Sequence, residues 1–534
     1  MWALWLACTS SPAEPAGDQT IEIDPVRLLT RASLDARGVR PSAAEIDAIA
    51  DDPSLLETYI ERFLVDERFP DRVIDLYGEL YLTQTESFRV PRTAFTFEEE
   101  VSAYQYASAI GDEPLRILAE IAENDLPYTD LVTADWTMHN EVLGQMYPSD
   151  YPPDATGWRR SRYTDARPSA GVLSTNGMWW RYGSTSSNLN RKRANQISRL
   201  FLCNDYLTRP IEFDRDVNLL DEAAVADAIQ TDPGCVACHV SLDPLASHLY
   251  GFWYLDDTNA GDATTYHPER ERLYLSFGTP PPAFYGQRTS TLGALGHSIA
   301  ADPRFVECAV EQAFSRLMGR EATLADGDAL AVHREAFITG GLTLRSLFRS
   351  IMAHPRYRAV DSNLEGYASK KWVTASLLAT QVEGLTGFVW TQGGVDMMST
   401  DGVGVGNLAG HADGYRVVRD SRSPNATMVL VSARLAEAAA AHVMATEADL
   451  EPSERALFTE VDFSERPSTD RGAMAVQIQH LHKAVLGRII PADGPEVNAN
   501  LDLWTELESA TRDPNVAWAG VLIALLRDPD FLMY

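Results

Sequence analysis

Apolar residues recur at helical spacing through most of the chain. One stripe consists of Leu55, Leu56, Tyr59, Ile60, Phe63 and Leu64. Residues three and four positions apart share one face of a helix, so this stripe predicts an amphipathic helix. Helix start signals accompany the pattern, because Asp24 precedes Pro25 and Ser42 stands three residues before Glu45, as in a capping box. The sequence therefore predicts a mainly α fold built from several helical modules.

Similar helical segments recur along the chain. The run F-S-R-L-M-G-R that ends at Arg320 is followed by A-D-G, and the run V-L-G-R that ends at Arg488 is followed by A-D-G as well. Each segment then closes on a similar run, H-P-R-Y from His354 and R-D-P-D-F from Arg527. The first helices close on D-E-R-F from Asp66 in the same way. We interpret these as three helix-turn-helix repeats, which are units that bury one another's apolar faces.

Two stretches interrupt the helical pattern. Residues 151–290 are rich in Pro, Gly, Ser, Thr and Tyr, which predicts long irregular loops. Residues 366–450 hold the glycine run Asp401–Asn407, which has no clear strand before it and is typical of a surface loop, and then an alanine-rich helix predicted over Asn425–Met444. We divide the chain into a tether (1–23), an N-terminal helical domain (24–150), the loop-rich region (151–290), a repeat unit (291–365), the glycine-containing region (366–450) and a C-terminal repeat unit (451–534).

The net charge of the chain indicates which macromolecules could bind to it. The 534 residues include 76 acidic and 45 basic side chains, which gives a net charge of −31. Such a surface repels polyanions, so we expect no nucleic acid as a partner. A basic partner protein would be attracted to it.

The clearest chemical signal is the run C-V-A-C-H, formed by Cys235, Cys238 and His239 with two residues between the cysteines. This spacing is typical of covalent attachment of haem c. The two thiols would bind the porphyrin vinyl groups, and His239 would supply the proximal nitrogen to iron. We therefore expect the region 151–290 to be cytochrome c-like.

Three other interpretations compete with haem. Cys203, Cys235, Cys238 and Cys308 could form a four-thiolate zinc site, although such sites usually bring their cysteines as two close pairs. The C-x-x-C pair could be a redox-active dithiol, but the preceding segment, residues 221–230, reads as a helix and not as a strand. A plain structural disulfide is the third.

Several residues are candidates for the surroundings of the haem. Arg191 and Arg193 form a basic cluster that could pair with the propionates. Met178 lies beside two tryptophans, and its thioether would complete a His/Met ligand pair. His248 follows His239 by nine residues and is a second candidate for the sixth ligand. A site that is vacant or holds water is the third possibility.

The beginning of the chain indicates export. Leu6-Ala7-Cys8 resembles the lipobox of bacterial lipoproteins, in which the cysteine becomes the acylated N-terminus, although no basic residue precedes it. We expect a periplasmic or outer-membrane-attached lipoprotein of a Gram-negative bacterium, with membrane contact only through a lipid anchor at Cys8. In an oxidising compartment the remaining Cys203 and Cys308 would tend to pair, with two buried free thiols as the alternative.

The sequence resembles the large exported cytochrome-like proteins of planctomycetes and myxobacteria. The resemblance rests on C-V-A-C-H followed by the D-P pair at Asp243, on G-V-L-S-T from Gly171, and on D-P-R-F-V-E-C from Asp302. It implies export, one haem c and electron transfer to or from a redox partner protein. The alternatives are a haem peroxidase or oxidase-like enzyme, and a cell-surface binding or scaffold protein with a structural metal site.

Overall fold

The computed structural model describes residues 20–208, 218, 220–361, 370–399 and 405–534. It is 61% helix and 4% strand, which confirms the predicted mainly α fold. The predicted lipid anchor at Cys8 and most of the glycine run at Asp401 lie outside the described residues.

The segment predicted to be the first repeat unit consists of α1 (Pro25–Arg37), α2 (Ala43–Asp51), α3 (Leu56–Phe63) and α4 (Phe69–Tyr81). The helix N-caps predicted from the sequence are present in α1 and α2. The side chain of Asp24 accepts hydrogen bonds from the first turn of α1, and Ser42 and Glu45 form the full capping box of α2. These side chains satisfy backbone N–H groups that have no partner inside the helix.

Two later sets of helices repeat this order. The second set is α14 (Pro303–Met318), α15 (Gly327–Thr339), α16 (Leu344–Ala353) and α17 (Pro355–Arg358). The third is α21 (Pro467–Leu486), α22 (Pro495–Thr511), α23 (Pro514–Leu526) and α24 (Pro529–Leu532). The first helix of each set ends at a left-handed glycine, Gly38, Gly319 or Gly487, with φ of 72°, 68° and 67°. Glycine adopts this conformation at little cost, so all three units turn at the same point.

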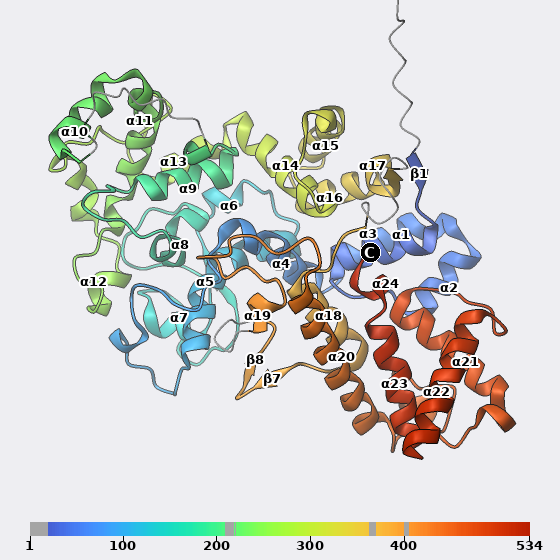
Figure 1. Cartoon of the computed structure of the whole chain (residues 1–534). Coiled ribbons are helices and arrows are strands. Elements are labelled where there is room, and N and C mark those ends of the chain that lie inside the picture. The colour runs from blue at the N-terminus through green and yellow to red at the C-terminus, as the bar shows by residue number, and fades with distance from the viewer. Residues whose placement is uncertain (1–19, 209–217, 219, 362–369, 400–404) are drawn as a thin grey trace, which may run out of the picture.

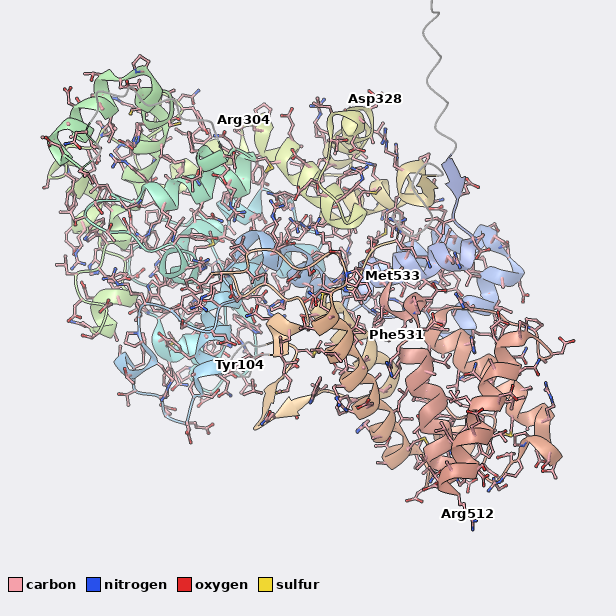
Figure 2. The ribbon with its side chains drawn as sticks, viewed as in Figure 1. Tyr104, Arg304, Asp328, Arg512, Phe531 and Met533 are labelled. Carbon is pink, nitrogen blue, oxygen red and sulfur yellow. A yellow bond between two sulfur atoms is a disulfide. The ribbon has the colours of Figure 1, made fainter. Side chains whose placement is uncertain are left out.

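The repeat units meet at the buried carboxylate of Asp35 in α1. Asp35 accepts hydrogen bonds from Lys371 Nζ at 2.5 Å, Tyr357 Oη at 2.7 Å and Tyr534 Oη at 2.9 Å. These donors come from the end of the second unit, from the chain after it and from the C-terminus. Figure 2 labels Phe531 and Met533, which lie near the C-terminal Tyr534 in the chain. One carboxylate thus joins segments that are more than 300 residues apart in sequence.

The other elements surround these units. The remaining α-helices are α5 (Ala103–Glu123), α6 (Asp130–Thr133), α7 (Glu141–Met146), α8 (Asn176–Arg181), α9 (Arg191–Leu202), α10 (Glu222–Thr231), α11 (Pro233–Ala246), α12 (Ala260–Thr264), α13 (Leu292–Ala300), α18 (Ala375–Thr386), α19 (Val405–Leu408) and α20 (Ala426–Glu447). Short antiparallel pairs join β1 (Thr20–Glu22) to β6 (Ala359–Asp361), β2 (Thr137–His139) to β3 (Arg159–Ser161), β4 (Ala283–Phe284) to β5 (Gln287–Arg288), and β7 (Thr391–Gln392) to β8 (Val395–Asp396).

The apolar side chains form separate cores. The largest draws buried residues from the segments 24–150, 151–290 and 291–365, so these three pack together. A second core holds most of the buried apolar residues after 372. Figure 1 shows α10 and α11 at one end of the molecule and the C-terminal unit at the other.

By length and apolar composition, α20 could cross a membrane. Half of its most apolar window is buried, and it packs against α18 and α23 through residues such as Leu435, Ala439 and Val443. That packing is typical of a core helix.

Candidate functional site

The C-V-A-C-H run lies in the first two turns of α11. Asp232 caps this helix, since its side chain accepts a hydrogen bond from the backbone N–H of Cys235 at 3.0 Å. Pro233 occupies the first helical position, where its missing N–H costs nothing. The cap thus fixes where the helix begins, two residues before the first cysteine.

Helical spacing places the three chemical groups on one side of α11. Cys235 and Cys238 are three residues apart, and His239 follows Cys235 by four, so their side chains share a face. Both thiols are free and partly buried. Cys238 packs against the largest core, while His239 keeps 22% of its side chain exposed. The helix therefore presents two thiols and an imidazole side by side.

The thiol environment differs from that of a reactive dithiol. Burial raises the pKa of Cys235, and the neighbouring carboxylate of Asp232 raises it further. Redox-active C-x-x-C pairs usually need a thiol with a lowered pKa, because the thiolate is the nucleophile. This environment disfavours the dithiol interpretation.

A carboxylate holds the imidazole of His239. Its Nδ1 lies 2.9 Å from Oδ1 of Asp243, one turn further along α11. Burial pushes the pKa of Asp243 up, but hydrogen bonds from Arg191 and His239 outweigh burial and leave that pKa below its ordinary value. An ionised carboxylate can only accept, so Nδ1 carries the proton and donates. Among the described residues, none forms a hydrogen bond with Nε2 of His239.

Arg191 completes this arrangement from the first turn of α9. Its Nε lies 2.7 Å from Oδ1 of Asp243, and its Nη2 lies 2.9 Å from Oδ2. This two-point contact is the geometry that an arginine and a carboxylate prefer. From the sequence, Arg191 is expected to pair with a propionate, and Asp243 is not among the predicted site residues. The propionate role stays a prediction, since Arg191 retains 19% exposure.

The inner side of α11 anchors it to the protein. Leu242, Leu245 and Ala246 are buried in the largest core. On the same helix, Ser241 Oγ lies 2.7 Å from Tyr206 Oη and donates to the carbonyl of Cys238 at 3.2 Å. The helix is therefore fixed along its second half, while its first half carries the motif.

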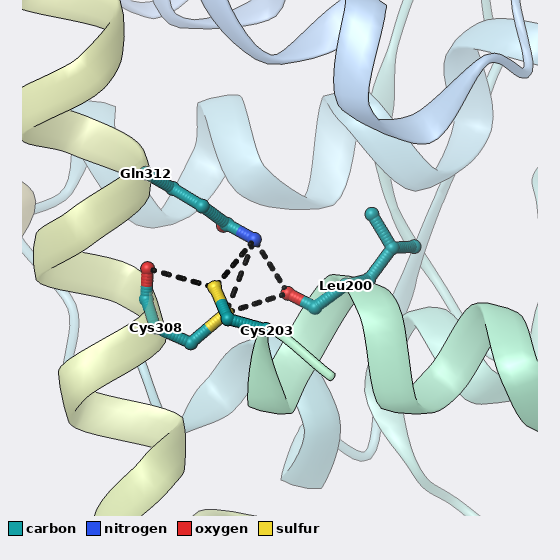
Figure 3. The surroundings of a disulfide bond; sticks show 4 residues. All are labelled: Leu200, Cys203, Cys308 and Gln312. Atoms are coloured by element: carbon teal, nitrogen blue, oxygen red, sulfur yellow. Dashed lines mark hydrogen bonds between the residues drawn. A yellow bond between two sulfur atoms is a disulfide. The ribbon is translucent and has the colours of Figure 1, made fainter. Parts of the chain in front are cut away.

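A disulfide joins Cys203, at the end of α9, to Cys308 in α14 (Figure 3). This confirms the predicted pairing of these two cysteines. The Nε2 amide of Gln312 lies beside it and donates to the carbonyl of Leu200 at 2.9 Å. Because two of the four sulfurs are bonded to each other, the four-thiolate zinc interpretation is wrong. The described residues also contain no group of three or more His, Cys, Asp or Glu side chains placed to hold a metal ion.

Two further predicted residues lie deeper in the protein. Met178 is fully buried in the largest core, on α8, which packs against α5. Arg193 is also buried and donates to the carbonyls of Tyr182 at 3.0 Å and Trp179 at 3.1 Å, so it closes the end of α8. Burial lowers the pKa of Arg193 to about 10. Their roles toward a haem stay predictions.

Both ring nitrogens of His248 have partners. Its Nε2 lies 2.5 Å from Oγ1 of Thr289, and its Nδ1 lies 3.2 Å from the carbonyl of Leu245. Burial lowers the pKa of His248 to about 4, so the ring is neutral near pH 7. A role as an iron ligand would require the bond to Thr289 to break.

The comparisons with known proteins add no relative, since no family model, curated protein or solved structure matches this chain.

Proposed function

We propose that the protein is an exported single-haem c-type cytochrome that transfers electrons. One observation carries the proposal: two free thiols and a histidine share one face of α11. Asp243 holds one nitrogen of this histidine, and the other has no partner among the described residues. Metal-bound histidines usually donate their second nitrogen to a carboxylate or a carbonyl, which fixes the ring and its tautomer. The donor set thus fits haem c.

Each residue of the C-V-A-C-H motif that could bind haem, and each residue that holds His239, would have a defined task. Cys235 and Cys238 would hold the porphyrin through thioether bonds, and His239 would face the iron with Nε2. Haem c supplies one-electron redox chemistry when bound. Asp243 and Arg191 position the imidazole and keep its Nδ1 proton in place. For the sixth position, Met178, His248 and water are the candidates.

The proposed location is the periplasm or the outer membrane, with a lipid anchor at Cys8. The disulfide between Cys203 and Cys308 supports this, because such bonds persist mainly in oxidising compartments. Covalent attachment of haem c also needs an exported chain. With a net charge of −31, the redox partner that fits best is a basic protein.

A haem enzyme of the peroxidase or oxidase kind is the second candidate. The carboxylate bond to His239 favours it, since a hydrogen-bonded imidazole is a more basic ligand and such partners tune the metal. The ferric spectrum separates the alternatives. A six-coordinate low-spin spectrum supports electron transfer, a high-spin spectrum supports the enzyme, and a colourless protein from cells with a cytochrome c maturation system would leave only a binding or scaffold role.

A further inference from the structure

A cavity of about 500 Å³ lies away from α11, between α4 and α5 on one side and residues 392–399 and 411–420 on the other. Tyr104 on α5, which is labelled in Figure 2, lines the cavity, and its Oη is 2.9 Å from Oγ of Ser399 on the opposite wall. The volume lies in the range of pockets that take small organic molecules. Two segments about 300 residues apart thus enclose the space together.

The lining of this cavity is strongly acidic. Its carboxylates are Asp75, Glu79, Glu86, Asp112, Asp413 and Asp420. Among the described residues that line it, none is a lysine or an arginine. Carboxylates that share a small volume repel one another, and a bound cation relieves that repulsion.

Glu79 offers an acceptor atom to a ligand, although two arginines pair with its charge. Its side chain is 10% exposed, and Oε2 accepts hydrogen bonds from Arg316 and Arg422, which approach from outside the lining. Its other oxygen, Oε1, is buried and accepts no hydrogen bond from any residue that the structure describes. A buried acceptor without a donor is unfavourable, so a ligand that brings an N–H group would be stabilised here.

The rest of the lining is apolar. Leu82, Ala107, Val395 and Met398 contribute hydrocarbon and thioether surface beside the carboxylates. A bare metal ion would leave this surface unused, and the described residues contain no group of three or more ligating side chains placed to hold one. A molecule with a cationic end and an apolar body would use both kinds of surface.

We propose that this cavity binds a small organic amine in its protonated form, with the ammonium group near Glu79, Asp75 and Asp112 and the apolar body against Met398 and Val395. The site is independent of the haem motif, so either one stands without the other.

Calorimetric titration of the full chain tests this inference with benzylamine and benzyl alcohol as probes. The two have the same ring and similar size, but only benzylamine carries a charge. We expect benzylamine to bind about tenfold more tightly or better, because the alcohol cannot pair with the carboxylates. Equal affinity for the two probes, or no measurable binding of benzylamine, would overturn the proposal.

Two variants locate the binding. Asp112→Asn keeps the acceptor for Gln84 Nε2, which lies 2.9 Å away, but removes a charge from the lining, and we expect benzylamine affinity to fall about tenfold. Asp502→Asn removes the same charge from an exposed position on α22 and is expected to change nothing. A third variant, Ala103→Trp, places a large ring at the exposed rim and is expected to abolish binding. If Asp112→Asn and Asp502→Asn weaken binding equally, the amine is bound by the general negative charge and the cavity site is refuted.

Discussion

Nδ1 of His239 lies 2.9 Å from Oδ1 of Asp243, and that carboxylate is held in turn by Arg191. In the proposed haem protein, this relationship would leave a single nitrogen of His239, Nε2, to bind the iron. A carboxylate partner makes an imidazole a more basic ligand, which stabilises the ferric state and lowers the reduction potential of a haem.

The variant Asp243→Asn should therefore raise the reduction potential of the haem-loaded protein by tens of millivolts. The amide keeps the size and one acceptor, but it no longer carries the charge that strengthens the bond from His239. A spectroelectrochemical titration measures this shift. A potential that is unchanged or lower in the variant would contradict the positioning role of Asp243.

Substitution of His248 should leave the iron coordination intact. Because Thr289 and the Leu245 carbonyl occupy its ring nitrogens, we expect His248→Phe to lower stability and to keep the ferric spectrum of the wild type. A change of spin state would show that His248 is the sixth ligand. The ferric spectrum of Met178→Leu tests whether Met178 is the sixth ligand. If it is, the variant should lose the far-red methionine–iron charge-transfer band.

The junction at Asp35 should dominate the stability of the repeat units. Asp35→Ala leaves the ammonium of Lys371 and two tyrosine hydroxyls buried without their acceptor, so we expect a loss of about 3–5 kcal/mol in the free energy of unfolding. The matched control is Asp47→Ala, which breaks a half-exposed ion pair with Lys483 and should cost about 0–1 kcal/mol. Denaturant unfolding of both variants gives the comparison. Equal losses would show that the buried junction has no special weight.

Amine binding in the acidic cavity should depend on pH. Burial raises the pKa of Asp75 to about 6, and the other charged groups that act on it are Arg72, Asp71, His411 and Asp420. Below that pKa the carboxyl is protonated and neutral, so it no longer attracts a cation. Benzylamine affinity should therefore increase as the pH rises from about 5 to about 7. Calorimetry across this range measures the effect. In Asp75→Asn the increase should be much smaller, and an unchanged pH profile in that variant would contradict the role of Asp75.

Local signals in the sequence predicted much of the fold. The capping box at Ser42 and the proline start of α1 are confirmed, because caps depend only on residues within one turn. Helix α5 contains a proline, which usually marks a helix boundary. The structure starts the helix at Ala103, with a second capping box between Ser102 and Gln105, and accommodates Pro114 inside it. A proline is tolerated there although it removes a backbone donor.

Contacts between residues that are far apart in sequence could not be predicted from local patterns. Asp243 stands four residues after His239, so their contact could have been inferred once both were placed on one helix. The bond of Arg191 to Asp243 spans 52 residues, and no local pattern indicates it. The acidic cavity depends on segments still further apart, which only the packing of α4 and α5 against residues 392–399 and 411–420 brings together.

The most direct test of covalent haem attachment is the intact mass of the protein produced with a cytochrome c maturation system, together with a pyridine haemochrome spectrum. We predict the mass of the polypeptide plus one haem, which remains after acid–acetone extraction, and a spectrum with two thioether bonds. The double variant Cys235→Ala/Cys238→Ala should lose this haem while it keeps the Cys203–Cys308 disulfide, so the loss would not reflect misfolding. A wild-type mass equal to that of the polypeptide alone, with no haemochrome absorbance, would contradict the proposal that the protein is a c-type cytochrome.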